Sequence, residues 1–114
     1  MSFLALASQK SLLTMQKSFL QLQYTHIQNE ITYAEAEMAA IQKRINEENG
    51  DSGGADYTEN PDYVYYEQMD ERLSTEKDLL DSQLTAIDSE ISSLKTMVNN
   101  NIKSSCTLNL ASGG

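Results

Sequence analysis

The residues with the greatest chemical potential are one histidine, one cysteine and seventeen carboxylates in a chain of 114 residues. His26 has no second histidine and no nearby cysteine, so the sequence offers neither a His-based metal cluster nor a Cys–His pair. Its position beside the main apolar stripe predicts a solvated side chain. The carboxylates lie in polar segments, where nothing suggests the apolar pocket that would tune them for acid–base catalysis. We therefore predict that the protein is not an enzyme and uses no cofactor.

The segment "DSGGADYTENPD" (residues 51–62) is acidic, but it lacks the EF-hand pattern of alternating oxygen ligands, central glycine and terminal glutamate. We predict no metal site there. Four of the six tyrosines lie in or near this segment: Tyr57, Tyr63, Tyr65 and Tyr66. Adjacent Tyr65 and Tyr66 must point to different faces of a helix, so at least one is exposed. Two interpretations remain open, a recognition surface and an aromatic cluster that closes the end of the fold.

Charge and hydropathy exclude several classes of partner. The net charge is −9, which disfavours nucleic acid because its phosphates would be repelled. The acidity is uneven, since residues 47–81 hold twelve acids against Arg72 and Lys77. No segment approaches the roughly 20 apolar residues of a membrane span. The opening "MSFLALASQK" lacks the charged region of a cleaved signal peptide, so any export would use an uncleaved route.

The elements that must position these residues follow from a regular apolar repeat. In residues 24–45, "YTHIQNEITYAEAEMAAIQKRI", apolar residues recur in steps of three and four, and the pattern extends back to residue 3. A second repeat covers residues 66–98. Strict seven-residue spacing is typical of a left-handed coiled coil. The predicted seam consists of Leu13, Leu20, Ile27, Ile31, Met38, Ile41, Leu80, Leu84, Ile87, Ile91, Leu94 and Val98.

Turn and cap signals divide the chain into one domain with two helices. Asn49–Gly50 is a helix stop, and Asn60–Pro61–Asp62 is a helix start, in which asparagine caps, proline opens and aspartate complements the helix dipole. We predict a helix over 3–48, an acidic glycine-rich loop over 49–60, a helix over 61–103 and a flexible tail over 104–114. The single Cys106 cannot form an intramolecular disulfide. The predicted fold is all-α, an antiparallel two-helix coiled-coil hairpin that forms oligomers.

The alignment of the two helices is a further prediction. Pairing the arms so that opposed residue numbers sum to 111 places the small Ala34 opposite Lys77, whose stem would cross the seam. The other predicted pairs are Ile45 with Tyr66, Met38 with Leu73, Ile31 with Leu80, Ile27 with Leu84, and Leu13 with Val98.

A second apolar stripe lies on the first helix, away from the seam, and the chain's other end has a similar surplus. A helix that is apolar on two sides needs more than one neighbour. We predict an assembly interface formed by Phe3, Leu4, Leu12, Met15, Phe19, Leu22, Met97 and Ile102. Its occupant is left open between further copies of the chain, a partner helix of another protein and a small closed bundle.

Three segments carry a resemblance: "MSFLALASQKSLLTMQKSFLQLQ", the "NPDY" break and the closing "EISSLKTMVNNNIKSS". In architecture the whole chain resembles type III secretion needle subunits, the terminal coiled-coil regions of flagellar axial proteins, and uncharacterised small bacterial coiled-coil proteins. The chain is longer than a typical needle subunit, its loop is glycine-rich and its tail is extended, so no individual residue role is transferred. The resemblance implies an exported, self-assembling structural subunit.

The resulting functional hypothesis is a structural subunit of a bacterial filament or secretion-related assembly, exported without a cleaved signal. The alternative is a cytoplasmic coiled-coil binding module, such as an export chaperone or scaffold, that holds a partner helix.

Overall fold

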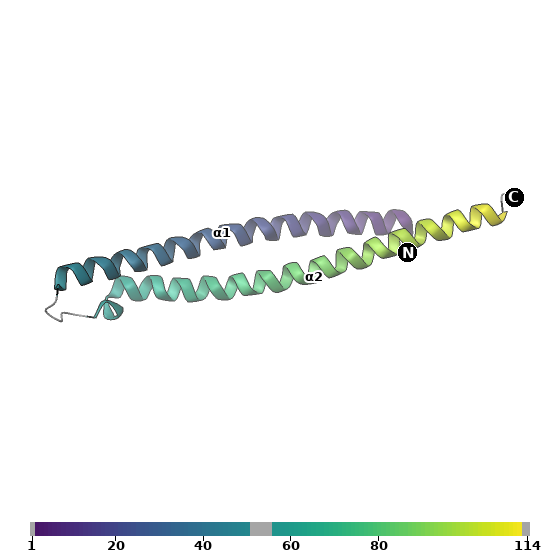
Figure 1. The fold of residues 1–114 in the computed structure, drawn as a ribbon. Coiled ribbons are helices and arrows are strands. Elements are labelled where there is room, and N and C mark those ends of the chain that lie inside the picture. Colours follow the sequence, from purple (N-terminus) through teal and green to yellow (C-terminus); the bar gives the residue numbers. More distant parts are fainter. Residues whose placement is uncertain (1, 51–55, 113–114) are drawn as a thin grey trace. The chain divides into compact units, whose positions relative to one another are not determined.

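The computed structural model describes residues 2–50 and 56–112, with the backbone alone for residues 105 and 107–112. It contains α1 (Phe3–Asn49), the short 3₁₀ helix η1 (Tyr57–Glu59) and α2 (Pro61–Ser112), and no strand among the described residues (Figure 1). The predicted all-α helical hairpin is confirmed. Neither helix holds, in its described part, an apolar stretch that could cross a membrane.

Local signals in the sequence set the ends of the helices. Ser2 caps α1 by accepting a hydrogen bond on Oγ from the backbone N–H of Ala5, at 3.2 Å. At the other end, Gly50 adopts a φ of +54° and its N–H donates to the carbonyl of Asn46 at 3.1 Å. That left-handed conformation ends a helix and suits glycine, which has no Cβ to clash. The stop predicted at Asn49–Gly50 is therefore confirmed.

Asn60 caps the start of α2, as the sequence predicts. Its side-chain Oδ1 accepts from the backbone N–H of Asp62 at 2.9 Å and of Tyr63 at 3.3 Å. Asp56 does the same for η1, accepting from Thr58 N–H at 3.0 Å. This backbone hydrogen bond holds the pKa of Asp56 below its ordinary value. The loop predicted over 49–60 thus contains one ordered turn, and its residues 51–55 lie outside the described part of the chain.

The end of α2 differs from the prediction. The tail expected from residue 104 is helical in backbone as far as Ser112. Figure 1 shows this last part of α2, in yellow, continuing past the start of α1. Seven-residue periodicity reports packing against a partner, whereas a helix satisfies its backbone hydrogen bonds internally. The loss of apolar period near residue 104 therefore marks the end of the paired region and not the end of the helix.

The contacts group the chain into two compact units. Unit 1 combines residues 1–22 with 82–114, and unit 2 comprises residues 23–81. Each unit pairs a segment of α1 with an antiparallel segment of α2. The buried apolar residues in the described part of unit 2 are Ile31, Ala34, Ile41, Leu73 and Leu80. In unit 1 the buried apolar residue, within the described part of the chain, is Leu6.

The predicted alignment of the helices is wrong by about one heptad. With Leu13 opposite Val98, Lys17 would face Leu94, but its ammonium lies 2.7 Å from a carboxylate oxygen of Asp88, six residues earlier. Lys77, expected opposite Ala34, instead has its ammonium 5.6 Å from the ring centre of Tyr24. Both contacts, one in each unit, join residues whose numbers sum to less than the predicted 111. A shift of seven residues leaves every residue in its seam row and changes only the partner.

A shift of one heptad would place Ala34 opposite Asp70, which occupies a row of the α2 repeat. One carboxylate oxygen of Asp70, Oδ1, is buried and has no hydrogen-bond partner.

Candidate assembly surface

The outer face of α1 in unit 1 carries a stripe of large apolar side chains. Leu12, Met15, Phe19 and Leu22 are 55%, 70%, 61% and 69% exposed. We call these four residues the α1 stripe. Their spacing of three, four and three residues keeps them on one side of the helix, and the seam lies on the other side. The other four residues of the predicted interface are also exposed: Phe3, Leu4, Met97 and Ile102.

An open groove of about 580 Å³ runs beside the α1 stripe, between α1 and α2. Its lining is predominantly apolar and consists of Leu12, Met15, Gln16, Phe19, Leu20, Gln83, Ala86 and Ile87. The seam residues Leu20 and Ile87 form its floor and are half-buried. Ala86 adds little bulk on the α2 side. The groove exists because two helices cover only one side of each seam residue, so its floor is left open to a further helix.

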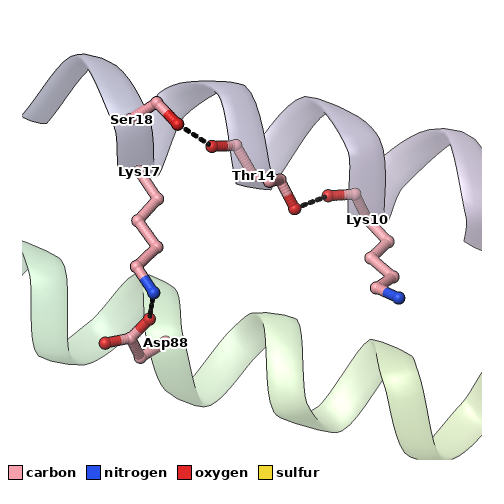
Figure 2. Close-up of polar contacts among 5 residues, drawn as sticks. All are labelled: Lys10, Thr14, Lys17, Ser18 and Asp88. Carbon is pink, nitrogen blue, oxygen red and sulfur yellow. Dashed lines mark hydrogen bonds and ion pairs between the residues drawn. The ribbon is translucent and has the colours of Figure 1, made fainter.

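Two kinds of polar contact lie near the α1 stripe, an ion pair across the seam and hydrogen bonds within α1. Figure 2 shows Lys17 reaching across from α1 to Asp88 on α2. It also shows Thr14 and Ser18 donating their hydroxyl hydrogens to the carbonyls of Lys10 and Thr14, at 2.8 and 3.1 Å. Hydroxyls that bond back to their own helix need no external partner. The polar residues around the α1 stripe therefore add little net charge to it.

The tyrosines of unit 2 pack mainly against one another. The ring centres of Tyr57 and Tyr63 are 5.2 Å apart, and Tyr66 lies 5.2 Å from Tyr65 and 6.0 Å from Tyr33, all edge to face. The hydrogen bond to Tyr33, then burial and nearby charges, raise the pKa of Tyr66 to about 12. Burial likewise raises the pKa of Tyr63, with Tyr57 and two acids contributing. This mutual packing supports the interpretation of an aromatic cluster, from which Tyr65 extends with 62% of its surface exposed.

The remaining chemically active residues are at the surface. His26 is exposed, and its Nε2 lies 2.7 Å from Oε1 of Glu30 one turn away. Cys106 is a free, exposed thiol. Within the described ranges, no three His, Cys, Asp or Glu side chains converge in a way that would hold a metal ion.

The structure places all twelve predicted seam residues in buried or half-buried positions. Ile31, Ile41 and Leu80 are buried, and the other nine are half-buried. Sequence reasoning missed Gln83 and Ala86, which line the α2 side of the groove together with the predicted seam residue Ile87. Ala86 is small and gives no apolar signal. The partners of these residues depend on the register, which the repeat does not specify.

Comparison with protein-family models, with curated proteins and with solved structures finds no match to this chain.

Proposed function

We propose that this protein is a structural subunit that self-assembles through unit 1. The observation that carries the proposal is the distribution of exposed apolar side chains. Of the eleven large ones on the described surface, eight lie in unit 1 and three, Tyr33, Tyr65 and Leu79, lie in unit 2. Isolated exposed apolar residues are ordinary on monomers, whereas a gathered set marks an interaction surface.

Charge favours the same surface. Unit 1 contains four lysines and two acids, a net of +2, whereas unit 2 contains fifteen acids and four basic residues, a net of −11. Contacts between two copies of unit 2 would bring large like charges together, whereas contacts between copies of unit 1 would bring together only small ones. In the assembly that we propose, unit 1 packs laterally and unit 2 faces water. A bacterial filament or secretion-related structure is the context suggested by the resemblance.

The test compares two single substitutions at equally exposed apolar residues. Phe19 is 61% exposed in unit 1, and Leu79 is 59% exposed in unit 2. We expect Phe19→Asp to abolish particle growth in light scattering and negative-stain microscopy while circular dichroism stays helical. Leu79→Asp should assemble like the unmodified chain. Loss of helicity in Phe19→Asp would make Phe19 part of the core, and equal effects of both substitutions would contradict the role of unit 1.

The groove favours a second candidate function. An apolar groove between two helices fits a third helix, as in a coiled-coil binding module that holds a partner protein. That module would work in the cytoplasm as an export chaperone or scaffold. A discrete dimer or tetramer at every concentration, with no growth of larger particles, would favour this candidate over the structural subunit.

A further inference from the structure

We infer that two copies of the chain pair through the α1 stripe, antiparallel, about a two-fold axis at the level of Lys17. This inference rests on the proposed function and names its first contact. The spacing of the stripe is the same read in either direction, three, four and three residues. An antiparallel copy therefore places Leu12 opposite Leu22 and Met15 opposite Phe19, twice each. Met15 and Phe19 are a favourable pair, since a thioether packs well against an aromatic ring.

The uncharged character of the stripe and its spacing together favour a second copy as the occupant. Between residues 11 and 23 the single charged residue is Lys17, and its ammonium is already paired with Asp88 at 2.7 Å. The stripe is thus uncharged and has no feature that would prefer a basic or an acidic partner. Its self-complementary spacing suits its own copy. Such a contact is isologous, because the same residues serve both subunits.

The acidic unit 2 selects the antiparallel direction. Gln23, the first residue of unit 2, follows Leu22, the last residue of the stripe. In a parallel pair, both copies of unit 2 would begin at the same end of the contact, each with a net charge of −11. In an antiparallel pair they begin at opposite ends, which lowers their repulsion.

The size of the contact sets its strength. Each stripe side chain exposes on the order of 100 Å², so eight from two copies bury on the order of 800 Å². Stable specific interfaces bury about 1,200–2,000 Å² in total. The pairing should therefore depend on protein concentration. Growth beyond the pair would use the four other exposed large apolar residues of unit 1, which the two-fold contact leaves free: Phe3, Leu4, Met97 and Ile102.

Two matched cysteine variants test the direction, each in a Cys106→Ser background. Ser18 and Ser11 are both exposed and lie on the same flank of the stripe. About an axis at Lys17, the two copies of Ser18 are offset by about 3 Å along the helix and those of Ser11 by about 18 Å, at 1.5 Å per residue. A disulfide requires Cα atoms within about 7 Å. Under mild oxidation we expect Ser18→Cys to form disulfide-linked dimers in several-fold excess over Ser11→Cys.

The outcomes separate this inference from the function on which it rests. Equal crosslinking at both positions would contradict an antiparallel pair about an axis at Lys17 and overturn the inference. Particle growth without crosslinking at either position would also overturn it, because assembly would then use another surface, and the proposed function would stand. A chain that stays monomeric at every concentration would overturn both. Adding Phe19→Asp to the Ser18→Cys variant should remove the crosslink, and a crosslink that persists would contradict the role of the stripe.

Discussion

Unit 1 and unit 2 are built from the same two helices and the same seven-residue repeat. Two helices nevertheless bury the apolar residues of unit 2 more completely than those of unit 1. Among the residues whose side chains the structure describes, unit 2 buries five apolar residues and exposes three large apolar side chains, whereas unit 1 buries Leu6 and exposes eight. The net charge is −11 in unit 2 and +2 in unit 1. The difference separates two uses of one pattern, because a single apolar stripe completes a hairpin, whereas a second stripe leaves large apolar side chains exposed on the outer face of α1.

The largest expected effect comes from truncating the seam in each unit. Leu73 in unit 2 is 3% exposed, whereas Leu94 in unit 1 is half-buried. We expect Leu73→Ala to lower the free energy of unfolding by about 2 kcal/mol, and Leu94→Ala to lower it by about 1 kcal/mol. Urea denaturation of dilute protein, followed by circular dichroism, measures both. Equal losses would show that two helices complete unit 1 as well as unit 2.

High pH should act on unit 2 through Tyr66. Its pKa is about 12 in the folded chain, above the ordinary tyrosine value of 10.0. The folded state keeps this proton where the unfolded chain releases it, so the stabilisation is complete below about pH 10 and is lost as pH rises towards 12. Tyr66→Phe should flatten the decline in melting temperature between these values. Tyr65→Phe is the matched control and should retain the decline; an unchanged decline in Tyr66→Phe would exclude Tyr66 as its source.

The smallest expected effect concerns the ion pair of unit 1. The side chains of Lys17 and Asp88 are 33% and 55% exposed, so water and salt screen their attraction. Lys17→Gln should change the free energy of unfolding by less than about 1 kcal/mol, and less still in high salt. A double-mutant cycle with Asp88→Asn isolates the pair. A coupling energy well above this range would mean that charge pairing, and not the apolar seam, holds unit 1 together.

The features of the fold that could be predicted from sequence are those that depend on neighbouring residues. The cap at Asn60 and the stop at Gly50 need only a few adjacent residues, and the seam rows need only the apolar repeat. The register could not be predicted, because sliding one helix by seven residues presents the same rows to each other. Ala86 gave no sequence signal for the groove, because it shapes the groove by having a small side chain. The residues of the candidate surface other than Phe3 were identifiable because an apolar residue outside the seam rows has no place in a two-helix fold.

Asp70 shows how the chain can settle on one register among equivalent ones. Its buried oxygen lacks a hydrogen-bond partner, which costs stability in the register that would place Asp70 opposite Ala34. One heptad away in either direction, the same carboxylate would meet Ile41 or Ile27, whose bulk leaves no room for water beside it. A polar residue buried in a seam can in this way favour one alignment of two helices over its neighbours, at some cost in stability.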